Sequence, residues 1–161
     1  MMEMYRNPVD NTISRIVLPI STVVFDMELR GFITVVEGWS GTGKTFFLNS
    51  LKSFYMNNKN MIRQKFGLQG ILFYDFNDID KDILFAVKRV KGYLILIDNA
   101  DMLLAADPKL LKYISHDTNN QYFIMSRGGV ALAVTPNHYC ELVREDKKIT
   151  TRYNCSVEGW M

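Results

Sequence analysis

Runs of apolar residues separated by amphipathic stretches divide most of this chain into strands that alternate with helices. Short apolar segments rich in β-branched or aromatic residues predict buried strands, and apolar positions spaced three and four residues apart predict helices that cover them. We expect strands at 32–36, 71–76, 93–97, 121–125 and 130–134, and helices at 44–57, 78–92, 100–106 and 108–114. The segment at 93–97 is the most hydrophobic, which indicates a central, parallel strand.

The two ends of the chain are less regular. Residues 1–12 are polar and turn-like, which predicts a loosely ordered start. Residues 13–25 are rich in β-branched types but contain Pro19, which cannot donate a hydrogen bond to a neighbouring strand. This segment is therefore expected to be an edge strand, a bulged strand or two short pieces, forming an extra N-terminal strand or hairpin. Near the C-terminus, 149–157 alternates weakly like a strand.

Strands that alternate with helices predict an α/β fold in which a mostly parallel, five-stranded sheet is flanked by helices on both faces, giving three layers. The length of 161 residues fits a single domain, 1–161. The composition is 48% hydrophobic, which is enough for a sizeable core and argues against a disordered chain.

Charge and cysteine content exclude few partners. A net charge of +2 does not by itself indicate a nucleic-acid or membrane partner. No apolar run approaches the roughly 20 residues that a membrane helix needs, and the first residues lack the form of a secretion signal, so we expect no membrane partner. The two cysteines, Cys140 and Cys155, are not in a metal-ligand spacing. This favours a cytoplasmic protein with free thiols, with a disulfide as the alternative.

One stretch carries the main chemical signal. Residues 38–45 fit the phosphate-binding pattern G-x-x-x-x-G-K-[ST], with a predicted strand before them and a predicted helix after them. Glycines let the backbone approach a ligand closely, and the amides of the loop and of the first helical turn then point at one anion. The predicted nucleotide-binding residues are Gly38, Trp39, Ser40, Gly41, Thr42, Gly43, Lys44 and Thr45.

Polar residues also follow the other predicted parallel strands, whose carboxyl ends meet at one edge of the sheet. Asp98 follows 93–97 and is expected near Thr45, where the two would hold Mg²⁺. The alternative role for Asp98 is to cap a helix. Arg127 follows 121–125, where it would contact a γ-phosphate, pair with a neighbouring carboxylate or remain solvated. Asp75 would bind a hydroxyl substrate or, more simply, form a turn.

Three segments together resemble the P-loop NTPases, most closely their ATPase branch with the AAA+ and STAND groups: GWSGTGKT at 38–45, LILIDNAD at 94–101 and YFIMSRG at 122–128. The resemblance covers about residues 31–128. It implies a three-layer P-loop NTPase-like fold, Mg²⁺ and ATP as cofactors, Asp98 as the Walker B aspartate and Arg127 at the sensor position. In that branch a glutamate that polarises the attacking water usually follows the Walker B aspartate. Here this position holds Asn99, which cannot accept a proton, and Asp101 would either substitute for it or cap the next helix.

The predicted protein is thus a minimal nucleotide-binding core without the lid domain that is common in that branch. Lys44, Asp101 and Arg127 are its candidate catalytic residues. The leading hypothesis is a Mg²⁺-dependent ATPase, or an ATP-driven switch of low turnover. The alternatives are a non-hydrolysing ATP-binding regulatory module, favoured by Asn99, and a small-molecule or nucleotide kinase, favoured by Asp75.

Predictions about partners are less specific. ATP is preferred to GTP because the guanine-reading pattern Asn-Lys-x-Asp is missing from the sequence. A switch also implies a protein partner, whose identity the sequence does not indicate. Basic residues at 59–65, 81–91 and 144–152 would suit a nucleic acid, but neighbouring acidic residues favour ordinary solvated faces.

Overall fold

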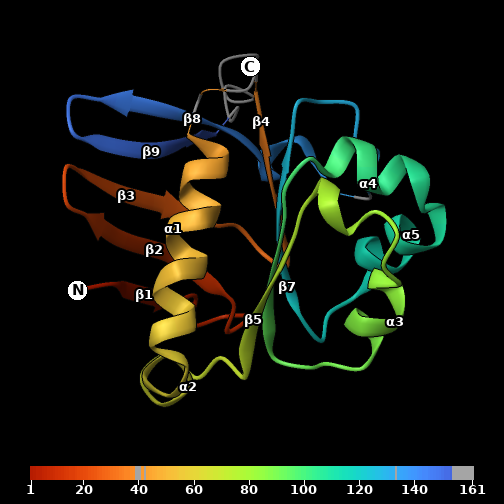
Figure 1. Cartoon of the computed structure of the whole chain (residues 1–161), viewed down its shortest axis with the longest axis horizontal. Helices are drawn as coiled ribbons and strands as arrows, with labels where there is room; N and C mark the ends of the chain where they lie inside the picture. The colour runs from red at the N-terminus through yellow and green to blue at the C-terminus, as the bar shows by residue number, and fades with distance from the viewer. Residues whose placement is uncertain (39–40, 42, 133, 154–161) are drawn as a thin grey trace.

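A computed structural model describes residues 1–38, 41, 43–132 and 134–153. In this part of the chain the strands form one sheet, and helices lie against both of its faces (Figure 1). The strands are β1 (Glu3–Arg6), β2 (Ile13–Ile20), β3 (Val23–Glu28), β4 (Ile33–Glu37), β5 (Gly70–Tyr74), β6 (Tyr93–Ile97), β7 (Gln121–Ser126), β8 (Tyr139–Glu145) and β9 (Lys148–Tyr153). The helices are α1 (Lys44–Asn57), α2 (Lys59–Phe66), α3 (Ile83–Lys88), α4 (Ala100–Ala106) and α5 (Pro108–His116), with 3₁₀ turns η1 (Phe76–Asp78) and η2 (Pro136–His138).

The sheet is mixed and strongly curled, in the form of a half-barrel. Its strand order is β1-β2-β3-β9-β8-β4-β7-β6-β5. The strands from β8 to β5 in this order run parallel to one another. β1, β2 and β3 are antiparallel, and β3 pairs in parallel with β9 of the antiparallel β8–β9 hairpin.

The predicted three-layer, mostly parallel sheet of the P-loop NTPase type is therefore wrong, although the α/β class is right. The error lies at the two ends of the chain. The N-terminal strands do not stand in front of the core as an extra hairpin, because β3 pairs with β9 and so continues the sheet. Since adjacent strands are rotated relative to each other, a sheet extended to nine strands bends round on itself.

Several predictions for single segments also fail. Residues 1–12 contain β1, which pairs with β2, rather than a loose start. Pro19 is accommodated because the pairing with β1 ends at Val17, so β2 has no β1 partner at the proline. The predicted strand at 130–134 does not form in the described residues of that segment, and the fifth parallel strand is β8. The predicted helix at 78–92 is shorter and consists of α3 alone.

Two hydrophobic cores hold the helices against the sheet. α1 and α2 lie within the curl and pack on its inner face, whereas α3, α4 and α5 cover the outer face of β5, β6 and β7 (Figure 1). Phe47 of α1 lies between Phe25 of β3 and Phe123 of β7, with ring centroids 5.2 Å and 5.5 Å apart. Because β3 and β7, on opposite sides of the curled sheet, both contact α1, the start of this helix is held at the carboxyl end of β4.

A buried amide links strands that are not neighbours in the sheet. Gln121, at the start of β7, is 5% exposed. Its side-chain oxygen accepts a hydrogen bond from the backbone N–H of Ile13, and its NH₂ group donates to the carbonyl of Ile13, both at 2.7 Å. The glutamine thus satisfies backbone groups of β2 where the curled sheet leaves no ladder partner for them.

Candidate functional site

The glycine-rich loop connects β4 to α1, as predicted. Gly38 has φ 138° and Gly43 has φ 106°, backbone conformations that L-residues with a side chain rarely adopt. Gly43 is the N-cap residue of α1 and supplies no side-chain cap. The N–H groups of the first turn therefore have no cap from that position, which leaves this helix end suited to an anion. Of the predicted nucleotide-binding residues, Trp39, Ser40 and Thr42 lie outside the described part of the chain.

Lys44 is the first residue of α1 and is only 7% exposed. Its ammonium donates a hydrogen bond to the carbonyl of Gly38, at the other end of the loop. Burial lowers the pKa of the Lys44 ammonium, the charges of Asp98 and Asp101 raise it, and that of Arg127 lowers it. The side chains predicted to be catalytic thus lie within electrostatic reach of one another.

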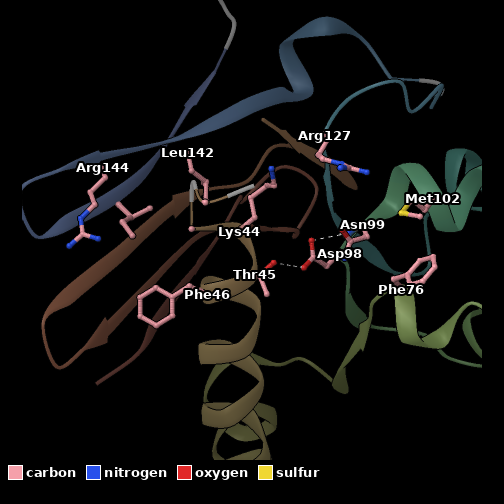
Figure 2. Close-up of a pocket in the computed structure, with 13 residues that line it drawn as sticks. Lys44, Thr45, Phe46, Phe76, Asp98, Asn99, Met102, Arg127, Leu142 and Arg144 are labelled. Carbon is pink, nitrogen blue, oxygen red and sulfur yellow. Dashed lines mark hydrogen bonds between the residues drawn. The ribbon is translucent and has the colours of Figure 1, made fainter. Parts of the chain in front are cut away.

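Thr45 and Asp98, the predicted metal ligands, are in direct contact. The Thr45 hydroxyl donates a hydrogen bond of 2.8 Å to Oδ2 of Asp98, at the end of β6 (Figure 2). Oδ1 of Asp98 accepts the backbone N–H of Asn99 at 2.9 Å, and the carboxylate is buried. Among the described residues, no three His, Cys, Asp or Glu side chains cluster as ligands for a metal. One carboxylate and one hydroxyl still fit Mg²⁺, which proteins usually hold through one or two carboxylates together with substrate phosphates.

Asn99 and Asp101, the two candidates for the position of a water-polarising glutamate, have other contacts in the structure. Asn99 is the N-cap residue of α4 with φ 51° and ψ 40°, the left-handed region. Asparagine enters this region more readily than most residues that carry a side chain. Asp101 is not the cap of α4; its Oδ2 lies 3.6 Å from Nε of Arg127. Its Oδ1 is buried and, within the described chain, has no hydrogen-bond partner.

Arg127 follows β7, and about half of its side-chain surface is exposed (51%). The carboxylate pairing that the sequence left open is observed, because the guanidinium faces Asp101. The same side chain lines the pocket over the loop (Figure 2). An ion pair this exposed contributes little to stability and can exchange for another anion.

The loop, the end of β6 and the end of β7 border a pocket of about 800 Å³. Six of the residues that line this pocket were not predicted as site residues from the sequence. These side chains are apolar or lie on the β8–β9 hairpin: Phe46, Phe76, Met102, Leu142, Arg144 and Ile149. No motif marks them, and the position of the hairpin depends on the β3–β9 pairing, which the apolar pattern does not predict.

Asp75, His138 and Cys140 are not among the residues that line this pocket. The Asp75 carboxylate accepts the N–H of Asn77 and caps η1, which is the turn role that sequence analysis favoured. Nδ1 of His138 lies 3.0 Å from the backbone carbonyls of Arg30 and Ile33. Burial raises the pKa of the Cys140 thiol to about 12, so this cysteine is inert at neutral pH.

Comparison with known proteins identifies no relative. No protein-family model, curated protein or solved structure matches this chain. The candidate site therefore has to be judged on its own geometry. Among the described helices, none is long and apolar enough to cross a membrane.

Proposed function

We propose that this protein binds Mg²⁺-ATP at the loop of residues 38–45 and acts as an ATPase of low turnover or as an ATP-driven switch. The observation that carries the proposal is the contact between Thr45 and Asp98, 2.8 Å apart, at the start of α1, where the N-cap residue is Gly43. A hydroxyl and a carboxylate meet beside a buried lysine, in a pocket large enough for a nucleotide. These are the groups needed to bind a metal and a polyphosphate chain together.

Each residue then has a defined task. The backbone amides of the loop and the Lys44 ammonium would bind the phosphates, and Thr45 and Asp98 would hold Mg²⁺. The metal ion, when bound, neutralises charge on the β- and γ-phosphates. Arg127 would exchange its contact with Asp101 for the terminal phosphate, because a guanidinium binds phosphate oxygens well.

Low turnover follows from the groups near the expected terminal phosphate. Asn99 cannot take a proton from water, and Asp101 faces Arg127. A non-hydrolysing regulatory module is therefore the second candidate function. The kinase hypothesis loses its supporting residue, because the Asp75 carboxylate caps η1. A switch acts through a partner, and we propose a protein partner in the cytoplasm, consistent with the free thiol of Cys140.

Mg²⁺-ATP titration combined with phosphate release tests this proposal. We expect wild-type protein to bind Mg²⁺-ATP and Lys44→Ala to lose the binding. Lys52→Ala, an equal charge change on the exposed side of the same helix, serves as the matched control and should bind normally. Binding without release would identify the regulatory module, and transfer of phosphate to an added acceptor would identify a kinase. Wild-type protein that fails to bind Mg²⁺-ATP would refute the proposal.

A further inference from the structure

The pocket extends to both sides of Lys44 and Thr45, and its two sides differ in chemistry (Figure 2). On one side lie the charged and amide groups of Asp98, Asn99 and Arg127, with Phe76 and Met102 beyond them. On the other side lie Phe46 of α1 and three residues of the β8–β9 hairpin, namely Leu142, Arg144 and Ile149.

The charged side marks where the terminal phosphate would lie. This step rests on the proposed function. Thr45 and Asp98 would hold a metal ion that neutralises phosphate charge at this end of the pocket, and Arg127 beyond them would provide positive charge for the γ-phosphate. The remainder of the nucleotide must then extend away from Asp98. That direction leads along the loop toward Phe46 and the hairpin (Figure 2).

The hairpin lies over Gly43, the last glycine of the loop. A Cβ placed on Gly43 would lie 3.5 Å from Cδ1 of Ile149 and 3.9 Å from Cδ1 of Leu142, so both side chains are in van der Waals range of the loop backbone. Leu142 and Ile149 are themselves almost fully buried, at 8% and 2% exposure. They can form an apolar floor for a ligand but offer it little surface.

Phe46 and Arg144 offer that surface. Phe46 is 45% exposed, and the edge-to-face packing of its ring on Phe25, at 5.2 Å between centroids, holds it in place. Arg144 is exposed, and its Nε donates to the backbone carbonyl of Asp146 at 3.3 Å, in the turn of the hairpin. An aromatic ring and a guanidinium plane are the two side-chain types on which a nucleobase stacks.

We propose that Phe46 and Arg144 form the nucleoside subsite of this pocket, with the β8–β9 hairpin as its wall. The base stacks on these two side chains, and the phosphates extend from there past Lys44 to Asp98. The hairpin thereby covers the nucleoside, which a separate lid domain would otherwise cover. Phe46 and Arg144 thus determine affinity for a nucleoside but not for a bare polyphosphate.

Comparison of two ligands, Mg²⁺-ATP and Mg²⁺-tripolyphosphate, tests the subsite by calorimetric titration. Tripolyphosphate carries the phosphate chain without base or ribose, so it binds only at the phosphate end of the pocket. We expect Phe46→Ala to weaken ATP binding about tenfold, the loss of one stacked base, and to leave tripolyphosphate binding unchanged. Phe46→Tyr, which keeps a ring, should bind both ligands like the wild type.

Variants of two exposed arginines of the hairpin provide a second, matched test. Both Arg144 and Arg152 are exposed, but only Arg144 lines the pocket. Arg144→Ala should weaken ATP binding severalfold without affecting tripolyphosphate, whereas Arg152→Ala should affect neither. Equal losses for both ligands would show that these residues only support the loop and would overturn the subsite. ATP binding unaffected by all variants would overturn it too, whereas wild-type protein that binds neither ligand would refute the proposed function itself.

Discussion

The hydroxyl of Thr45 in the first turn of α1 donates a 2.8 Å hydrogen bond to the buried carboxylate of Asp98 at the end of β6. Thr45→Val keeps the shape of the side chain and removes this donor. Because a hydrogen bond to a charged group contributes about 1.5–3 kcal/mol, we expect unfolding to become easier by roughly that amount in urea denaturation. We also compare the affinity for ATP with and without Mg²⁺. In Thr45→Val, the factor by which Mg²⁺ raises the affinity for ATP should be about ten times smaller than in the wild type. Ser50→Ala on the same helix is the control, and full Mg²⁺ dependence in Thr45→Val would exclude a metal role.

Lys44 keeps its charge in a nearly buried position, which opposes folding. Burial lowers the pKa of its ammonium below the usual 10.5, so the unfolded state binds more protons between the folded pKa and 10.5. Stability is reduced at pH values below that window and recovers as the pH rises through it. The stability of Lys44→Met relative to wild type should therefore be greater at pH 7 than at pH 10.5, because methionine carries no ammonium that titrates. Thermal melts at several pH values measure this, with Lys52→Met on the exposed side of the same helix as the control for the loss of one charge.

Arg127 is paired with Asp101 through an exposed contact of 3.6 Å. Arg127→Ala should change the free energy of unfolding by less than about 1 kcal/mol. If the guanidinium binds the terminal phosphate, the same variant should weaken ATP about tenfold and leave ADP unchanged. Parallel titrations with the two nucleotides decide this. An equal loss for ATP and ADP would place Arg127 elsewhere along the phosphate chain. Arg89→Ala, directly after α3, removes the same charge and serves as the control.

Asn99 has a left-handed backbone, and that conformation restricts which residues can replace it. Asn99→Glu should lower the free energy of unfolding by about 1 kcal/mol, because glutamate enters the left-handed region less readily. Asn99→Gly removes the Cβ and should be nearly neutral at this position. Denaturant titration of both variants makes the comparison. Phosphate release that rises in Asn99→Glu would show that a missing carboxylate limits turnover.

Gln121 supplies both hydrogen bonds to the backbone of Ile13. Gln121→Leu fills similar space but leaves the N–H and carbonyl of Ile13 unsatisfied and buried. We expect a loss of about 2–4 kcal/mol of stability, with nucleotide binding to the remaining folded protein unchanged. The exposed Gln69→Leu variant controls for the change in polarity. A neutral Gln121→Leu would mean that water or a small shift satisfies these backbone groups.

The sequence predicts those parts of the molecule that local rules control. β4, β6, β7 and α1 lie where apolar periodicity indicates, and Thr45 meets Asp98 because parallel strands bring their carboxyl ends to one edge. The overall shape depends on long-range pairing instead. Nothing local to Val24 indicates that it lies beside Lys148, and this pairing extends the expected five-stranded, mostly parallel sheet into a mixed half-barrel.

The same limit applies to the pocket. Motif spacing identifies Lys44 and Asp98, but Phe46 and Arg144 carry no motif and line the pocket only because the hairpin folds over the loop. The motif also does not predict the left-handed backbone of Asn99, since the same spacing is compatible with several backbone conformations at that position. Sequence analysis therefore finds the phosphate end of the pocket and misses its opposite end.

The parallel pairing of β3 with β9 has a kinetic consequence. Residues 23–28 leave the ribosome long before residues 148–153, so β3 can pair with β2 but not with β9 until the later residues have also been made. This raises the contact order of the chain and predicts slow folding. Until then β3 presents an open edge to solvent, so the growing chain is most exposed to aggregation, and most dependent on chaperones, at that edge.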